Sequence, residues 1–355
     1  MINKISLSLA FTSLTILSSL NADTLIHIAD NKRVTVNGEI ENENNQSVSI
    51  KIDGQEKITK LKAANVLSIT RSKFPDSLIE AHALSLSATW NNDKITKAVD
   101  ALDKVRSSDN KDIPKWVKEY AARYKIDLFY SIGNLAETSK AVEEFADIFS
   151  DSRQLLHYYK KVAHLAINAN DSKKIREITT HLTSLDAKLG SILSFYLDCQ
   201  LKLKNNDYIE AEKKLKTLIN KHIPNLGKEQ TLEIQDLYLN SVESYGFSLL
   251  SLKKTDEAKK QLDILKKHIS EADDRVTGLY LSLSADFSKA NGDHKAAYHN
   301  YMKLVVQFPH QKDLQARALV NAIEMTKELK LDKVVPILTK QLKMTHQSYK
   351  QIKLK

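Results

Sequence analysis

The sequence predicts a mostly α-helical protein, in which an α-solenoid of about seven helical hairpins follows a small five-stranded β-barrel. The first observation is the scarcity of turn-forming residues: eight Gly and five Pro occur in 355 residues, well below the usual share of about 7% and 5%. The second is a switch from strand-like to helical apolar spacing near residue 70. The third is a set of short polar turns that recur at a nearly constant interval. Together they argue against an all-β sandwich and a Gly-rich nucleotide-binding fold.

The first 22 residues are expected to be a secretory signal peptide. Lys4 precedes an uncharged, mostly apolar run from Ile5 to Leu20, and Ala22 provides the small residue before a cleavage point. The run is short and rich in hydroxyl groups for a membrane span, although an uncleaved N-terminal anchor is the alternative. Cys199 is the single cysteine, so no intrachain disulfide can form. A secreted protein without disulfides is most natural in a bacterial periplasm or envelope.

Residues 23–72 are predicted to form the β-module. Apolar residues alternate there in five short runs, separated by turn-forming pairs such as Asp30-Asn31 and Asp53-Gly54. Five short strands in under fifty residues bury one face by curling into a small barrel. The segment resembles the SH3-like or Sm-like modules that follow the signal peptide in many bacterial envelope proteins. The strings that carry this resemblance are Asp23-Thr24-Leu25, Val36-Asn37-Gly38-Glu39-Ile40, Val48-Ser49-Ile50 and Ala64-Asn65-Val66-Leu67-Ser68-Ile69.

Residues 73–345 are predicted to be the helical array, and residues 346–355 a basic C-terminal tail. Seven short turns, each built on Asn or Asp, separate pairs of amphipathic segments. The spacings between Asp93, Asn134, Asp171, Asp207, Asp256, Asp293 and Asp332 are 41, 37, 36, 49, 37 and 39 residues. A near-constant period indicates an α-solenoid, in which each hairpin buries its apolar stripe against the next hairpin. Asp and Asn at these turns also favour capping of the following helix.

The array resembles the tetratricopeptide repeat family, whose repeat is about 34 residues long. The sixth unit matches best: Gly292 lies at the turn, Ala297 at the small helix-contact position, Tyr301 at the aromatic position and Pro309 after the second helix. The resemblance implies that small residues let paired helices approach closely. The residues at these small positions are Ala98, Ala141, Ala163, Cys199, Ala211, Gly246, Ala258 and Ala285. Most units lack the family's aromatic in the first helix, and Pro336 departs from the pattern in the seventh unit.

The same resemblance implies that the first helix of each pair lines a concave binding face. The candidate partner-binding residues on this basis are His157, Lys160, His164, Asn168, Tyr196, Gln200, Lys204, Asn240 and Glu243. Their mixture of amide, basic and aromatic groups suits an extended peptide or an acidic segment. The alternative is that they are ordinary exposed helix residues. The Lys/Asn/Arg carboxylate clamp of chaperone-binding members is absent.

The charge balance does not favour a nucleic-acid partner. The chain has 53 Lys and Arg against 44 Asp and Glu, but only eight of the basic residues are Arg. Base and phosphate recognition favours the planar guanidinium of Arg. The Lys residues also alternate with acidic residues, as solvated helix faces do. Contact with an anionic lipid or envelope polymer remains an alternative.

No catalytic or cofactor motif is present. The sequence has no His-Glu-x-x-His, no G-x-S-x-G, no Walker loop and no G-x-G-x-x-G. His294 and His299 are five residues apart, so they do not share a helix face well. His157 and His164 are seven apart and could share a face, but no carboxylate or thiolate stands at helical spacing to them. We therefore expect no catalytic residue, metal or cofactor.

The expected function is that of a non-catalytic protein-interaction scaffold of the bacterial envelope. The partner would be a protein or peptide bound on the concave face of the array. The alternative is a module that binds or tethers an envelope polymer, either peptidoglycan or another polysaccharide, through the β-module.

Overall fold

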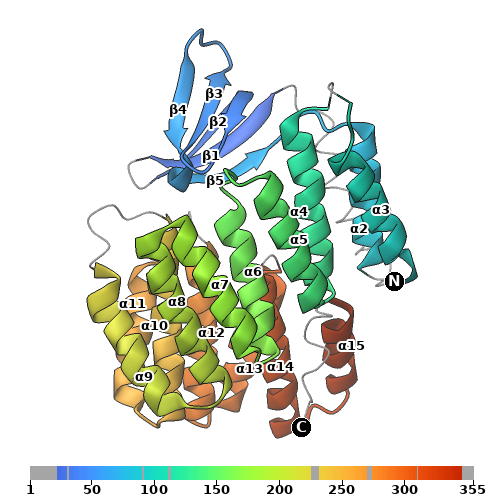
Figure 1. Ribbon diagram of the computed structural model, residues 1–355. Helices are drawn as coiled ribbons and strands as arrows, with labels where there is room; N and C mark the ends of the chain where they lie inside the picture. The colour runs from blue at the N-terminus through green and yellow to red at the C-terminus, as the bar shows by residue number, and fades with distance from the viewer. Residues whose placement is uncertain are drawn as a thin grey trace. The chain divides into compact units, whose positions relative to one another are not determined.

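The computed structural model describes residues 22–29, 32–89, 92–110, 113–224, 232–269, 274–309 and 311–345. Within these ranges the protein is mostly helical, with fourteen α-helices after a five-stranded antiparallel sheet (Figure 1). The predicted signal segment up to residue 21 and the predicted tail at 346–355 lie outside the described residues.

The chain divides into two compact units, which are described in turn. Unit 1 comprises residues 1–128 and 140–158, and unit 2 comprises residues 129–139 and 159–355. The predicted module boundary after residue 72 lies inside unit 1, between the last strand and the first described helix.

All five predicted strands of unit 1 are present. They are β1 (Asp23–Ala29), β2 (Lys32–Glu43), β3 (Ser47–Ile52), β4 (Ile58–Lys62) and β5 (Val66–Thr70), in the spatial order β4-β3-β2-β1-β5. Because β1 pairs with both β2 and β5, the edges are β4 and β5, and the sheet is open. The short 3₁₀ helix η2 (Ala63–Asn65) carries the chain from one edge to the other. Closure into the predicted barrel is therefore not shown.

Strand alternation explains which face of the sheet is buried. Successive side chains of a strand point to opposite faces, so every second residue lies on the same face of the sheet. The buried members of this core are Leu25, Ile40, Val48, Ile50 and Val66. Their spacing is the alternation that predicted the strands.

A charge network joins the sheet to the helical residues of unit 1. The buried guanidinium of Arg71 donates to Asp23 Oδ2 at 3.1 Å and to Glu43 Oε2 at 3.4 Å, and it lies 5.0 Å from the ring centre of Trp116. Arg153, which lies just before the helix that begins at Leu155, donates from Nε to Glu43 Oε1 at 2.6 Å. Glu43 therefore bridges two arginines, and a buried carboxylate with two such partners is strongly fixed in place.

The helices follow one another in seven successive pairs, which is the number predicted from the turns. The first three pairs are α2 (Asp76–Ala88) with α3 (Ile95–Arg106), α4 (Lys115–Ser131) with α5 (Leu135–Ile148), and α6 (Leu155–Asn168) with α7 (Ser172–Leu185). The other four are α8 (Ala187–Lys204) with α9 (Tyr208–Thr217), α10 (Leu232–Ser251) with α11 (Thr255–Lys267), α12 (Asp274–Ala290) with α13 (His294–Gln307), and α14 (Lys312–Glu328) with α15 (Val335–Thr345). The boundary between units 1 and 2 falls within α4, α5 and α6.

Six of the turns within these pairs share one backbone device. Each contains a single residue with positive φ, between 56° and 78°, and these residues are Gly133, Asn170, Asn206, Lys253, Gly292 and Lys330. A left-handed residue ends a helix sharply, and Gly and Asn adopt this conformation at low cost. Four of the six positions carry the Gly or Asn that the sequence pattern predicted, whereas Lys253 and Lys330 adopt the same conformation at higher cost.

The predicted helix caps are present at four turns. The side chains of Asn134, Asp171, Asp207 and Asp293 accept hydrogen bonds from the backbone N–H three residues later. Asp256 is different: it lies in the first turn of α11, and Lys254 at the cap position provides no side-chain bond. An acidic residue there still stabilises the helix because it lies near the positive end of the helix dipole.

The small residues assigned to helix contacts are all buried. The set consists of Ala98, Ala141, Ala163, Cys199, Ala211, Gly246, Ala258, Ala285 and Ala297. At Gly246 on α10, an added Cβ would lie 2.6 Å from Leu283 Cδ2 on α12. Leu283 is itself fully buried, so a side chain at position 246 would force Leu283 to shift within the core.

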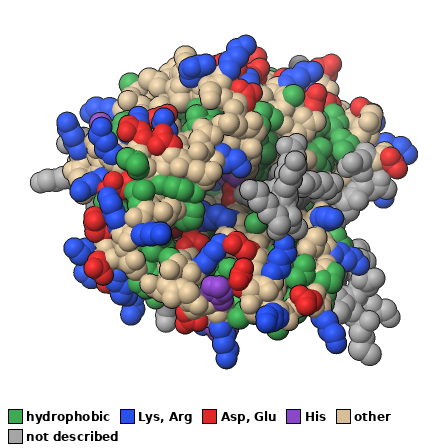
Figure 2. Space-filling view, turned by 90° about the horizontal axis from the view of Figure 1, so that it is seen from below, with side chains coloured by type: hydrophobic (Ala, Val, Ile, Leu, Met, Phe, Trp, Pro, Cys, Tyr) green, Lys and Arg blue, Asp and Glu red, His purple; other side chains and the backbone are tan. Residues whose placement is uncertain are grey.

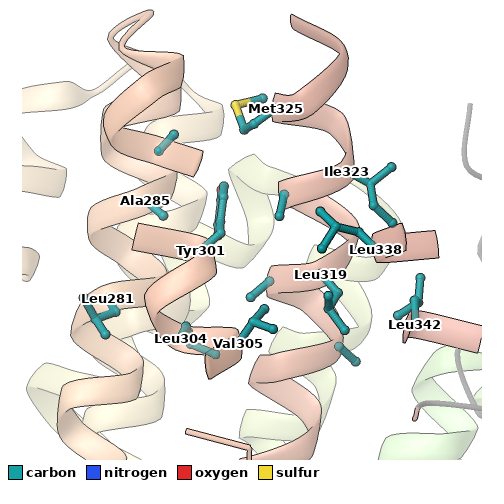
Figure 3. Packing of buried hydrophobic residues seen from close by; sticks show 14 of the residues in the cluster. Leu281, Ala285, Tyr301, Leu304, Val305, Leu319, Ile323, Met325, Leu338 and Leu342 are labelled. Carbon is teal, nitrogen blue, oxygen red and sulfur yellow. The ribbon is translucent and has the colours of Figure 1, made fainter. Parts of the chain in front are cut away.

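The core at the C-terminal end of unit 2 shows how successive helices pack. Figure 3 shows Leu319 and Ile323 of α14 facing Leu338 and Leu342 of α15. Tyr301 of α13 lies on the other side of α14, close to Ala285 of α12. Each helix of this region therefore buries apolar residues against the helix before it and the helix after it. Pro336 lies in the first turn of α15, where the missing N–H of proline is tolerated.

Candidate functional site

The first helices of the last four pairs form a row in unit 2. Helix α10 packs against both α8 and α12, and α12 packs against α14. Polar side chains from these helices, and one from α13, lie close together along the row. We call this group the polar cluster: Tyr196, Gln200, Glu243, Ser244, Ser282, Asp286, Tyr301 and Arg317.

The centre of the polar cluster is a charged contact between three helices. Glu243 of α10 is only 3% exposed, and its carboxylate Oε1 accepts hydrogen bonds from the Arg317 guanidinium of α14 and, at 3.1 Å, from Ser282 Oγ of α12. Arg317 also donates to Ser282 Oγ at 2.5 Å. A buried carboxylate is costly unless it is paired and hydrogen-bonded, and these two partners meet that need.

A buried acid lies next to this contact. Asp286 of α12 accepts a hydrogen bond at 2.5 Å from the hydroxyl of Tyr301 on α13. Burial raises the pKa of Asp286 to about 6, although the positive charge of Arg317 opposes the shift. Burial and the carboxylate of Asp286 also raise the pKa of the Tyr301 hydroxyl, so this hydroxyl stays protonated and acts as a donor.

Helix α8 contributes the amide and phenol groups of the polar cluster. Gln200 Nε2 donates to Ser244 Oγ of α10 at 2.9 Å, and the hydroxyl of Tyr196 is hydrogen-bonded to the same serine. Burial, together with the negative charge of Glu243, raises the pKa of Tyr196. Three of the predicted site residues, Tyr196, Gln200 and Glu243, are therefore brought together through Ser244 and the neighbouring charge.

Lys160 of α6 faces charged residues of α10 and α12. Burial lowers the pKa of its ammonium group, while Glu233 and Asp236 act in the opposite direction and Arg275 adds to the decrease. Asp236 is also paired with Arg275, with an N–O distance of 2.5 Å. The predicted residue Asn240 donates its side-chain amide to the backbone of Asp236 within its own helix. Lys160 thus lies in a mixed-charge setting and is not a simple surface cation.

A second polar group surrounds His164. Asn168 Nδ2 lies 3.0 Å from His164 Nε2, Tyr130 Oη lies 3.0 Å from His164 Nδ1, and Tyr130 donates to Asp313 Oδ1 at 2.9 Å. One proton arrangement satisfies all three bonds: the amide donates to Nε2, the Nδ1–H donates to the tyrosine oxygen, and the tyrosine donates to the aspartate. The arrangement connects α6 with the first residues of α14.

The remaining predicted residues stand apart from these groups. His157 is exposed on α6, where its ring lies 5.3 Å from that of Tyr158, and Lys204 is exposed at the end of α8. The nine predicted residues therefore divide into four sets. Tyr196, Gln200 and Glu243 belong to the polar cluster, and His164 and Asn168 to the second polar group. Lys160 and Asn240 lie near Asp236, and His157 and Lys204 are separate surface positions. Whether they bind a partner stays a prediction.

Sequence reasoning missed five members of the polar cluster. They are Ser244, Ser282, Asp286, Arg317, and Tyr301, which was predicted only as a packing aromatic. The contact between Glu243 and Arg317 joins positions 74 residues apart, which no local pattern reveals. One signal was present: Arg317 is one of eight arginines in a chain that otherwise uses Lys, and Arg is favoured for buried ion pairs.

The described residues provide no constellation for metal binding. No group of three or more His, Cys, Asp or Glu side chains in the described ranges could hold a metal ion. Cys199 is buried, and burial raises the pKa of its thiol to about 12, so the reactive thiolate is disfavoured. Its position on α8 is that of a small packing residue, as predicted.

Surface charge is interspersed over the face drawn in Figure 2, where Lys and Arg alternate with Asp and Glu. Among the described residues, several charges form pairs between helices, such as Lys214 with Asp198 at 2.7 Å and Lys289 with Glu324 at 2.7 Å. Exposed pairs of this type contribute little stability, about 0 to 1 kcal/mol each. Their mixed distribution on this face differs from the single-sign stripe that nucleic-acid binding favours.

No protein-family model matches the chain, and no curated protein matches it significantly. Within the described part of the chain, no helix combines the length and the apolar character that a membrane span requires.

The raised pKa of Asp286 predicts a specific dependence of stability on pH. The carboxyl group binds its proton more tightly in the folded chain, at about pH 6, than at its ordinary value of 3.8. Its contribution to stability is therefore complete below pH 4 and is lost as the pH rises through about 6. We expect Asp286→Asn, which retains an acceptor for Tyr301, to remove this loss.

The measurement is urea unfolding of both proteins between pH 4 and pH 7.5. The difference in unfolding free energy, variant minus wild type, should increase with pH by roughly 2 to 3 kcal/mol. A difference that stays constant over this range would contradict the assignment. Asp263→Asn, on an exposed part of α11, is the control.

Proposed function

We propose that this protein is a non-catalytic interaction scaffold, in which a tetratricopeptide-like solenoid binds a protein or peptide on the face of its first helices. The row of first helices in unit 2 carries this proposal, because it brings hydroxyl, amide and charged groups from four helices together. Extended peptides are recognised by such groups at regular spacing along a rigid surface. The polar cluster supplies the rigidity, since each of its charged groups has a hydrogen-bonded partner.

The solenoid assignment has three supports. The helices form successive pairs, consecutive helices from α7 to α15 pack against each other in chain order, and six turns within pairs share one left-handed residue. In a solenoid most contacts of a repeat are with its neighbours, so local turns and small contact residues specify the architecture. The bond between Tyr130 and Asp313, which joins the second and seventh pairs, departs from this pattern. We extend the same inference to the N-terminal sheet and propose that it acts as an SH3-like or Sm-like module.

We also propose that the protein is exported across the inner membrane and acts in the periplasm or envelope. The predicted cleavage point after Ala22 immediately precedes β1. The next residue, Asp23, is the first residue of the sheet, and its buried carboxylate bonds to Arg71 and to the backbone and hydroxyl of Ser72. Cleavage at this point would leave every residue of the folded sheet in the mature chain.

The binding proposal can be tested by site-specific photo-crosslinking in the intact chain. A photo-reactive residue is placed at His157 or Lys204 on first helices, or at Lys303 on the second helix α13 as the control. All three positions are exposed, so substitution should leave the fold unchanged. We expect a discrete protein adduct from envelope fractions at His157 and Lys204 and none at Lys303.

Adducts of equal yield at all three positions, or at Lys303 alone, would contradict this surface assignment. Absence of any protein adduct, together with co-sedimentation of the full chain with isolated cell-wall material, would favour polymer binding by the β-module instead.

Export has its own test. Expression in a bacterial host, followed by mass spectrometry of the exported protein, should give an N-terminal peptide that begins at Asp23. An exported protein that still begins at Met1 would show that the segment is retained as an anchor.

A further inference from the structure

Helices α2 and α15 are the first and the last of the described helices, and both expose apolar side chains. Among the described residues they are the helices with more than one large apolar side chain at the surface. On α2 these are Ile79, Leu84 and Leu86, with exposed fractions between 36% and 45%. On α15 they are Ile337 at 64% and Met344 at 48%. Terminal repeats of a solenoid normally carry a polar outer face, so both surfaces are unusual.

Two exposed apolar residues of each helix share one side, whereas Leu84 lies on another side of α2. On α2, Ile79 and Leu86 are seven residues apart, which places them on the same helix face, and Asp76 and Glu80 lie within the same exposed arc. On α15, Ile337 and Met344 have the same spacing. These two apolar stripes resemble each other in length and in the size of their side chains.

The charges of the two helices are opposite. Helix α2 contains Asp76 and Glu80 and no Lys or Arg, whereas α15 contains Lys340 and Lys343 and no acidic residue. Beside α15 lies an open groove of about 670 Å³, whose apolar lining includes Val335, Pro336 and Met344. Its charged lining consists of Lys340, Lys343 and Lys327 of α14, against one acid, Asp332. This surface therefore suits an apolar ridge flanked by carboxylates.

We propose that α2 of one copy of this chain docks on the α15 surface of a second copy, head to tail. The ridge of Ile79 and Leu86 supplies the apolar side chains, and Asp76 and Glu80 meet the lysines of α15. The basic tail at 346–355 is a poor occupant by charge, because it carries Lys350, Lys353 and Lys355 and no acid. A contact between different surfaces of identical chains is heterologous, so it can continue into rings or chains of molecules.

The test uses sedimentation velocity of the full chain over a wide range of protein concentration. The wild type should show association that strengthens with concentration and weakens with salt, because the contact depends on exposed charges. Two variants reverse the charge of one helix each: Asp76→Lys with Glu80→Lys, and Lys340→Glu with Lys343→Glu. Each variant alone should associate at least about tenfold more weakly, since like charges then face each other.

An equimolar mixture of the two variants should associate again. In the mixture, the acidic α2 of one variant meets the basic α15 of the other, and the remaining two surfaces are also complementary. The matched control is Lys295→Glu with Lys303→Glu on α13, which should associate like the wild type. All of these side chains are exposed, and circular dichroism verifies the fold.

Three results would overturn the proposal: a wild type that stays monomeric at every concentration, variants that associate like the wild type, or a mixture that remains monomeric. If a charge variant does not fold, Ile337→Gln replaces it. This single exposed substitution should weaken association, and unchanged association would also overturn the proposal.

Discussion

The helical part of unit 2 depends on one charged contact, between the buried Glu243 of α10 and the partly exposed Arg317 of α14, with Ser282 of α12 bonded to both. A carboxylate that is 3% exposed has lost nearly all of its contact with water, so it requires a cation and further donors. Glu243 and its two partners come from three different first helices. The contact therefore specifies how the helices are placed relative to one another, beyond what apolar packing alone would determine.

The close approach of the helices makes this contact possible. Gly246 lies one turn from Glu243 on α10, and its missing side chain lets Leu283 of α12 approach. Neighbouring Tyr196 and Gln200 are then positioned through Ser244, and Asp286 is held by Tyr301. Small residues set the spacing of the row, and polar residues set its alignment. The polar groups of the row are engaged with one another, so they hold the first helices in a fixed alignment.

Local signals predicted most of the fold. Alternation of apolar residues located five strands, and the recurring Asn, Asp and Gly turns located seven helix pairs, because each signal depends only on residues close in sequence. Two turns use Lys253 and Lys330 in place of Asn or Gly, so their left-handed conformation had no sequence signal. The sheet is open, whereas a closed barrel was predicted. Closure requires that the edge strands β4 and β5 pair with each other, and strand periodicity does not determine this pairing. The candidate site was predicted only in part. The resemblance to tetratricopeptide repeats pointed to Tyr196, Gln200 and Glu243, but Arg317 is 74 residues away from its partner Glu243, and no local pattern connects them.

The unfolding free energies of Arg317→Ala and of Arg317→Ala combined with Glu243→Gln test the role of this contact most directly. If the contact aligns the row, Arg317→Ala leaves the buried carboxylate without its cation. Because the Arg317 side chain is partly exposed and water can enter its place, the expected cost is roughly 1 to 3 kcal/mol. Adding Glu243→Gln removes that charge while retaining an acceptor for Ser282, and should recover most of the loss. A single variant as stable as the wild type, or a double variant that loses still more stability, would contradict the account.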